Sequence, residues 1–279
     1  MPRAGPLIRR LAAALVTLAL AVTAPGAGER PLLAAHRGGA ALWPENSLTA
    51  FRGALTLGVD ALEFDLHLTA DGEPVVIHDA TLDRTTTGHG TVRSFTLARL
   101  KALRLLDRAG APSTDTVPTL AQVLELARPT SVTVLPEIKL DLARAPYPDI
   151  ERRVVALLRA HGFLRRAVVQ SFDDGTLTRL RALEPALRTM LLVNRVRMSA
   201  QAVRSVDPVR WAVDLGATDL GVDFRLVDAP MVAAARAAGV RLSVWTVNTD
   251  DDLKRMGALG VDLVMTDRPD RARELLVQP

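Results

Sequence analysis

Short apolar runs alternate with amphipathic segments along the chain after residue 30. Each run has four to ten residues rich in aliphatic or β-branched side chains, a composition typical of buried strands. The predicted strands lie at residues 32–35, 61–66, 131–140, 167–172, 189–193, 219–224, 241–247 and 261–267. The segments between them have apolar residues at helical spacing, and several end at glycine, a common residue just past a helix end. They predict helices at residues 47–58, 119–127, 150–162, 174–185, 229–239 and 251–260.

The regular alternation of strands and helices predicts the fold class. It is typical of α/β domains in which parallel strands are joined by right-handed crossovers. Eight predicted strands in one domain, residues 29–279, fit a (β/α)8 TIM barrel. An open doubly wound sheet is the alternative, but it normally has a glycine-rich phosphate loop after its first strand. The sequence HRGGAALWPEN at residues 36–46 does not match that loop.

One region interrupts the alternation after the second predicted strand. Residues of about 80–117 include TLDRTTTGHGTV, a basic helical piece at 97–106 and then TDTVP. This region is too long for an ordinary connection between strand and helix. Long connections usually have a function, and in a barrel they lie at the carboxyl ends of the strands. We therefore expect a short insertion that extends over an active site.

The N-terminal residues have the pattern of an export signal. Arg3, Arg9 and Arg10 precede an apolar segment at residues 11–22, and small residues follow. The apolar segment is short for a membrane span. The pattern predicts a signal peptide at residues 1–28, cleaved between Ala24 and Gly28, and a periplasmic or secreted protein without stable membrane insertion. An uncleaved anchor is the alternative.

Composition excludes several classes of site. The chain has no cysteine, which excludes disulfides, thiolate metal sites and cysteine nucleophiles. Its net charge is +4, but the arginines are scattered at helical spacing and do not form a basic run. This distribution indicates solvated helix faces and argues against nucleic-acid binding. A modest positive field would suit a small anionic substrate.

Charged residues interrupt three of the apolar runs. Residues two apart on a strand share a face, so Glu63 and Asp65 point the same way, as do Glu137 and Lys139. His36 and Arg37 follow the first predicted strand. In a barrel these groups would converge at one rim, because the first three predicted strands would be neighbours.

Converging carboxylates at such a rim need a nearby cation. Glu63, Asp65 and Glu137 offer only oxygen ligands, which favour Mg²⁺ or Ca²⁺. The alternative is a salt-bridge network in which Arg37 and Lys139 neutralise the carboxylates. Beside a metal ion, these two cations would instead indicate an anionic ligand, and arginine suits bidentate binding of phosphate.

Two histidines are candidates for acid–base catalysis. His36 lies at the predicted rim, and His78 follows a short apolar run after the second strand. Their ordinary pKa values near 6.5 suit a general acid and a general base for cleavage of a P–O bond. His67 continues the face of Glu63 and Asp65 but is predicted to lie beyond the end of the strand.

Other polar residues near the predicted strand ends are open to two interpretations. Glu45 and Asn46 could cap the first helix, or Glu45 could orient His36 or Arg37. Trp245 could belong to the core or form a wall of the substrate pocket. Asp267 and Pro269 are interpreted as a turn and a helix start.

Several motifs occur together in an order that resembles one known family. They are HRG (36–38), PENS (44–47), ALEFDLHLTADGEPVVIHD (61–79), RTTTGHG (84–90), VPTL (117–120), PEIK (136–139), SF (171–172), WTVN (245–248) and VMTDRP (264–269). Over residues 32–270 the chain resembles the glycerophosphodiester phosphodiesterases. The resemblance implies a TIM barrel that hydrolyses glycerophosphodiesters, such as glycerophosphocholine or glycerophosphoethanolamine, to sn-glycerol 3-phosphate and an alcohol.

The resemblance also assigns roles to residues. It implies that His36 and His78 are the acid–base pair, that Glu63, Asp65 and Glu137 bind one divalent cation, and that Arg37 and Lys139 contact the phosphate. Two other functions remain open at this point. One is a phospholipase-type barrel acting on lysophospholipids, and the other is an exported binding protein for phosphate esters without catalysis.

Overall fold

The computed structural model describes Met1 and residues 30–201 and 204–277. The predicted signal peptide, apart from Met1, lies outside the described residues and stays a prediction. No helix in the described residues is both long enough and apolar enough to cross a membrane.

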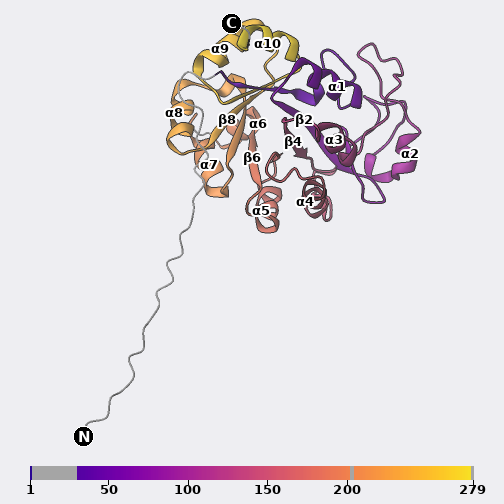
Figure 1. Cartoon of the computed structure of the whole chain (residues 1–279), viewed down its shortest axis with the longest axis horizontal. Coiled ribbons are helices and arrows are strands. Elements are labelled where there is room, and N and C mark those ends of the chain that lie inside the picture. The colour runs from indigo at the N-terminus through magenta and orange to yellow at the C-terminus, as the bar shows by residue number, and fades with distance from the viewer. Residues whose placement is uncertain (2–29, 202–203, 278–279) are drawn as a thin grey trace.

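Eight parallel strands close into a barrel with helices around the outside (Figure 1). Pairing runs in order around the ring, and β1 pairs with both β2 and β9, which closes it. The strands are β1 (Leu32–Ala35), β2 (Ala61–Leu68), β4 (Thr133–Ile138), β5 (Val168–Ser171), β6 (Arg188–Val193), β7 (Asp219–Asp223), β8 (Arg241–Trp245) and β9 (Leu263–Thr266). The predicted TIM barrel and its eight strands are confirmed, and the open sheet is excluded.

Helices connect the strands. They are α1 (Leu48–Leu57), α2 (Leu97–Lys101), α3 (Leu120–Ala127), α4 (Ile150–Ala160), α5 (Asp174–Leu183), α6 (Arg195–Gln201), α7 (Asp207–Leu215), α8 (Ala229–Ala237), α9 (Asp250–Leu259) and α10 (Pro269–Leu276). The six predicted helices are confirmed within a few residues, and α10 begins at the expected Pro269. Both α6 and α7 were missed. The sequence of α6, RVRMSAQ, has no clear apolar stripe, and α7 includes a proline that is tolerated only because it lies at the helix start.

Strand alternation divides the core into two parts. On β2, Leu62, Phe64 and Leu66 pack outward with the helices in the larger apolar cluster. The barrel interior holds a smaller apolar cluster that includes Ala34, Leu135 and other residues on the alternate strand positions. Glu63, Asp65 and His67 occupy the same inward set of positions on β2, so a charged site can sit inside an otherwise apolar barrel.

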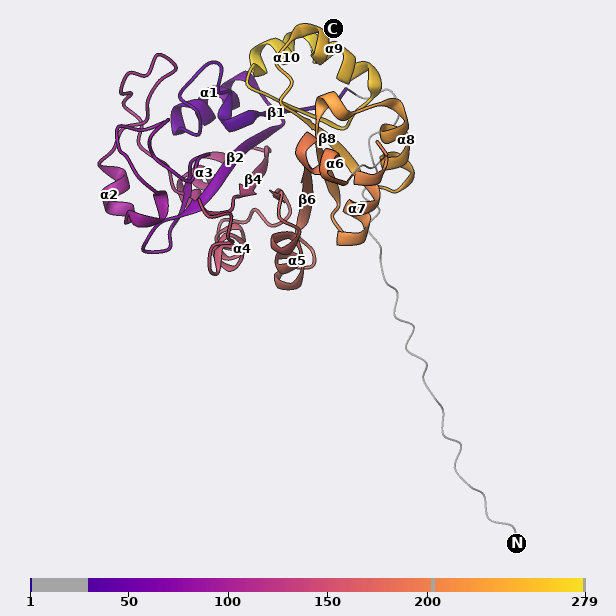
Figure 2. The ribbon, with the colours of Figure 1, turned by 180° about the vertical axis from the view of Figure 1, so that it is seen from behind.

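The predicted insertion forms a small subdomain. It begins after the three-residue strand β3 (Pro74–Val76), which is antiparallel to β2, and it includes α2. A separate apolar core joins this region to β3 through seven buried residues: Val75, Ile77, Leu82, Val92, Leu100, Leu105 and Val117. In both views it projects from the side of the barrel near α1 and α3 (Figures 1 and 2). The basic helical piece expected at residues 97–106 is shorter, because α2 ends at Lys101.

Candidate active site

A cavity of about 260 Å³ opens at the carboxyl ends of the strands. Seven of the eight predicted site residues line it: His36, Arg37, Glu63, His78, Glu137, Lys139 and Trp245. Asp65, the eighth, is buried beside them and bonds to Lys139. The predicted convergence at one rim is therefore what the structure shows.

A tight turn after β1 places His36 and Arg37. Arg37 has φ of 51°, and its backbone N–H donates to Oε2 of Glu63 at 2.9 Å. Gly38 follows with φ of 80°, and a Cβ atom there would lie 2.7 Å from the Cβ of Ala50 in α1. Glycine is required at this position by both the left-handed backbone and the close approach of α1.

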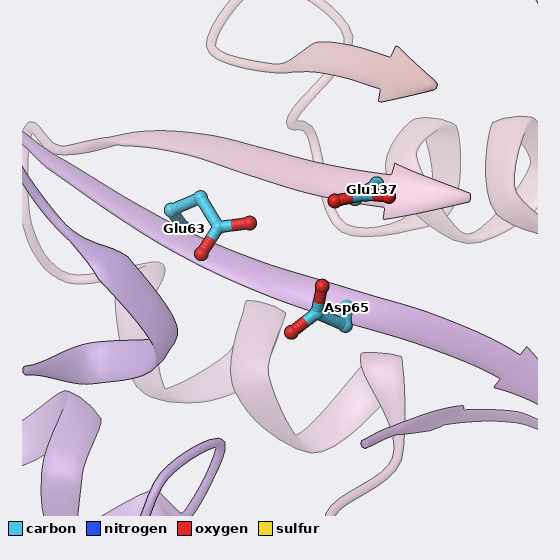
Figure 3. Close-up of side chains that lie close together, drawn as sticks. All are labelled: Glu63, Asp65 and Glu137. Carbon is cyan, nitrogen blue, oxygen red and sulfur yellow. The ribbon is translucent and has the colours of Figure 1, made fainter. Parts of the chain in front are cut away.

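The three predicted metal ligands lie together. Glu63 and Asp65 project from β2 and Glu137 from β4, where Asp65 and Glu137 are register partners (Figure 3). One carboxylate oxygen from each lies within 4.8 Å of the other two, and all three residues are buried. Three hard oxygen donors at this spacing fit one Mg²⁺ or Ca²⁺.

Two cations balance part of this negative charge. Lys139 Nζ lies 2.9 Å from Oδ1 of Asp65 and 2.7 Å from Oε1 of Glu137, and Arg37 Nε lies 3.5 Å from Oδ2 of Asp65. Burial alone would raise the pKa of Asp65, but Lys139 and Arg37 hold it below its usual range. The salt-bridge network considered from the sequence is thus present around Asp65 and Glu137.

Glu63 is not neutralised by that network. Burial and the neighbouring charge of Asp65 raise the pKa of Glu63 to about 7. Within the described residues, His36 is the only basic side chain within 4.0 Å of its carboxylate, with Nε2 at 3.9 Å from Oε2. The carboxylate cluster therefore has room, electrostatically, for a further cation.

His36 is held by a carboxylate that was misread in the sequence. Its Nδ1 lies 2.6 Å from Oδ1 of Asp267, whose other oxygen accepts a hydrogen bond from Asn248 Nδ2 at 2.7 Å. The interpretation of Asp267 as only a turn residue was incomplete. Barrel closure was the available signal, since β9 must lie beside β1 and Asp267 directly follows β9.

The bond to Asp267 fixes the tautomer of His36. Nδ1 keeps its proton and donates a hydrogen bond to the carboxylate of Asp267. This leaves Nε2 facing the cavity. Burial would lower the pKa of His36, but Glu63 and Asp267 outweigh burial and raise it.

Replacement of Asp267 by asparagine tests this arrangement. An amide can donate to Nδ1 and so stabilise the tautomer with the proton on Nε2, which is wrong for proton transfer there. We expect kcat to fall by roughly 100-fold or more. Asp270→Asn, a surface carboxylate paired with Arg268, should leave kcat unchanged. Equal kinetics in both variants would show that Asp267 does not orient His36.

His78 has a similar partner. Its Nδ1 lies 2.6 Å from Oδ1 of Asp79, the next residue, and Arg84 in turn bonds to Asp79. Burial and the nearby Lys139 lower the pKa of His78. Both histidines thus have Nδ1 bound to an aspartate and belong to the lining of the same cavity.

The prediction that His67 lies beyond the strand end is wrong. Strand β2 continues to Leu68 because β3 pairs with it, and His67 is buried. Its Nε2 lies 3.0 Å from the backbone oxygen of His78, which can only accept, so Nε2 carries the proton and Nδ1 accepts from the hydroxyl of Tyr147 at 2.8 Å. Burial lowers the pKa of His67 to about 4, so the ring is neutral and supports the backbone at His78.

Replacing His67 by phenylalanine should destabilise the protein. The change leaves the Tyr147 hydroxyl and the His78 carbonyl without their partner, and each unsatisfied buried group costs about 1–3 kcal/mol. Denaturant unfolding should show this loss, and the additional change Tyr147→Phe should recover part of it. An unchanged free energy of unfolding would contradict the proposed support.

Glu45 and Asn46 do not cap α1. Ser47 caps it by accepting from the backbone N–H of Ala50 at 2.9 Å. Glu45 instead accepts from Arg37 at 3.1 Å, so it orients Arg37 and not His36, and Asn46 Nδ2 donates to Oδ2 of Asp65 at 2.9 Å. The capping interpretation is therefore wrong, and both residues belong to the site.

The cavity lining also includes Trp245, which was predicted, and Gln170, which was not. Trp245 ends β8 and packs edge-on against Phe172 with ring centroids 5.6 Å apart, so it is a pocket wall that also contacts the barrel interior. Gln170 on β5 was missed because a lone glutamine has no titration signature. Its Nε2 donates to Oε1 of Glu63 at 2.9 Å and so orients that carboxylate.

Comparison with known proteins agrees with this geometry. The profile of the Glycerophosphoryl diester phosphodiesterase family matches residues 36–271. A glycerophosphodiester phosphodiesterase from Caldanaerobacter subterraneus is 34% identical over 242 residues, covering 86% of this chain and 96% of that protein. One from Bacillus subtilis is 30% identical over 257 residues, covering 87% and 85%.

Solved structures show the same likeness. A glycerophosphodiester phosphodiesterase from Agrobacterium tumefaciens has a TM-score of 0.72 at 28% identity and covers 87% of this chain and 99% of that chain. A phosphodiesterase from Oleispira antarctica, solved with the product sn-glycerol-3-phosphate, has a TM-score of 0.74 at 26% identity and covers 88% and 96%. The resemblance seen in the motifs is confirmed: the chain belongs to the glycerophosphodiester phosphodiesterase family and is a phosphoric diester hydrolase.

Proposed function

We propose that this protein is a metal-dependent phosphodiesterase that releases sn-glycerol 3-phosphate from glycerophosphodiesters such as glycerophosphocholine or glycerophosphoethanolamine. The observation that carries the proposal is one cavity with two aspartate-bound histidines, two cations and a carboxylate trio. The Oleispira antarctica enzyme, with sn-glycerol-3-phosphate as its product, supports the choice of substrate class.

Glu63, Asp65 and Glu137 would hold the metal ion. The observations that fit are the closeness of their oxygens and the environment of Glu63, whose pKa is raised by burial and by the neighbouring charge of Asp65. A bound divalent ion would act as a Lewis acid toward a phosphate oxygen.

Arg37 and Lys139 would bind the phosphate. Arg37 can present two N–H groups to two oxygens, and Lys139, which directly follows β4, adds a compact charge. Glu45 and Asp65 hold Arg37 in position. Asp65 and Glu137 hold Lys139 in position. These preorganised cations would then stabilise the negative charge that develops on the phosphate oxygens during P–O cleavage.

His36 and His78 would move the protons. Because Nδ1 of each ring is bound to an aspartate, Nε2 is the atom available to take a proton from the nucleophile or give one to the leaving alkoxide. Catalysis needs one histidine that accepts a proton and another that donates one, both in the same cavity. A protein that only binds its ligand needs neither. The paired histidines therefore favour catalysis over the binding-protein alternative.

A coupled assay for the released headgroup alcohol, choline or ethanolamine, tests the substrate class. Both substrate classes release this alcohol, whereas cleavage of the same bond in a lysophospholipid yields a lysophosphatidic acid and not sn-glycerol 3-phosphate. Glycerophosphocholine and glycerophosphoethanolamine should be hydrolysed faster than lysophospholipids of the same headgroups. Faster turnover of the lysophospholipids would instead favour the phospholipase-type alternative.

We also propose export of the mature enzyme on the strength of the N-terminal pattern. Recovery of the full-length protein only from the cytoplasm after cell fractionation would oppose this proposal.

A further inference from the structure

We propose that Arg84, in the insertion, is a positioning residue that orients both His78 and Arg37 by bridging Asp79 and Glu45. This inference rests on the proposed function, since it assigns a role to a residue that does not itself line the cavity. It means that the insertion completes the active site and does more than cover it.

The guanidinium of Arg84 makes two paired contacts. Its Nε and Nη2 donate to the carboxylate of Asp79 at 2.6 and 3.2 Å. Its Nη1 and Nη2 donate to the carboxylate of Glu45 at 2.8 Å each. Arginine is suited to this arrangement because its planar group presents several N–H donors in fixed directions.

Each carboxylate leads directly to a predicted site residue. Asp79 Oδ1 lies 2.6 Å from Nδ1 of His78, and Glu45 Oε1 lies 3.1 Å from Nη1 of Arg37. The chain of contacts therefore runs from one proposed acid–base group to one proposed phosphate-binding group. Its centre is Arg84.

The segment that carries Arg84 is anchored in the insertion. Leu82 is fully buried in the apolar core of that region, and its backbone oxygen accepts from the N–H and the hydroxyl of Thr86 at 3.0 and 2.8 Å. The guanidinium therefore approaches the barrel from a turn that is itself fixed. This is the condition under which an arginine can orient its partners rather than follow them.

Removing Arg84 should affect His78 and Arg37 differently. Asp79 would lose the group that holds it against His78, so proton transfer should slow. Glu45 would lose one of its two cations and pair more fully with Arg37, where it would compete with the substrate phosphate. The first effect lowers kcat, and the second raises KM.

The effect on folding should be small by comparison. The Arg84 side chain is 48% exposed, and ion pairs at such exposed positions contribute little to stability. A large kinetic effect with a small stability effect would therefore separate positioning from a structural role.

The experiment compares Arg84→Ala with wild type on glycerophosphocholine. We expect kcat to fall by about 10- to 100-fold, as for other groups that orient active-site ligands, and KM to rise. Millimolar guanidinium chloride should restore part of the lost kcat, whereas sodium chloride at the same concentration should not. Arg84→Lys should remain impaired because one ammonium cannot make paired contacts to two carboxylates.

Two further variants sharpen the result. Arg104→Ala is the matched control, because Arg104 is also an insertion arginine but donates to the backbone oxygen of Thr114. It should behave as wild type. Adding Glu45→Gln to Arg84→Ala should lower KM again while kcat stays low, because the competing charge is removed but His78 remains unsupported.

The possible results separate this inference from the proposed function. If the wild type is active, two results would overturn the positioning role. One is unchanged kinetics in Arg84→Ala, and the other is an impaired Arg84→Ala enzyme whose kcat guanidinium chloride does not restore. A wild type that releases no sn-glycerol 3-phosphate would contradict the proposed function instead. In that case, calorimetric binding of sn-glycerol 3-phosphate still tests the contacts from Arg84 through Glu45 to Arg37. Weaker binding by Arg84→Ala supports their proposed role, and equal binding overturns it.

Discussion

Alanine in place of His36 or His78 is expected to reduce release of sn-glycerol 3-phosphate by about 100- to 10,000-fold, the usual contribution of general acid–base catalysis. Each ring has Nδ1 bound to an aspartate, and no other histidine among the described residues lines the cavity. The measurement is kcat on glycerophosphocholine. Full activity in either variant would remove that histidine from the mechanism.

The same variants should remain folded. Both rings lie at the cavity rather than in the apolar core, so their removal creates no buried apolar void. Thermal unfolding should therefore differ little from wild type. His89→Ala is a matched control, because the His89 side chain lies in the insertion and is 84% exposed. Its activity should not change.

Glutamine in place of Glu63 is expected to weaken metal binding by at least about 100-fold, because loss of a group that merely orients a ligand already costs 10- to 100-fold. The change keeps the size of the side chain and removes its charge. Titration with Ca²⁺ and Mg²⁺ by calorimetry measures the effect independently of turnover. Activity should fall in parallel and recover only at higher metal concentration.

The control for this variant is another buried carboxylate. Glu151 lies in α4 and pairs with Arg179 away from the cavity, so Glu151→Gln should leave metal affinity unchanged. A Glu63→Gln enzyme with wild-type metal affinity would contradict the assignment of the carboxylate cluster as the metal site.

The strands and the main site were predictable from local pattern. Alternation on a strand is a short-range property, so Glu63 and Asp65 could be placed on one inward face of β2 from the sequence alone. The order of parallel strands then brought Glu137 and Lys139 beside them. The family motifs agreed with that reasoning residue by residue.

The supporting residues were harder to predict because their roles depend on long-range closure. Asp267 contacts His36 from 231 positions away, and only closure of β9 on β1 brings them together. Arg84 acts from a turn whose path depends on the insertion core, and Gln170 has no charge to mark it. His67 was misplaced because the pairing of β3 lengthens β2 beyond its apolar run.

The most direct test of the central proposal is one coupled assay of the purified enzyme with glycerophosphocholine. It would be run with Mg²⁺, with Ca²⁺ and with a chelator in parallel, and binding would be followed separately. We expect sn-glycerol 3-phosphate to appear with at least one of the two ions and not with the chelator. Tight binding without turnover under every condition, or full turnover in the chelator, would contradict the proposal.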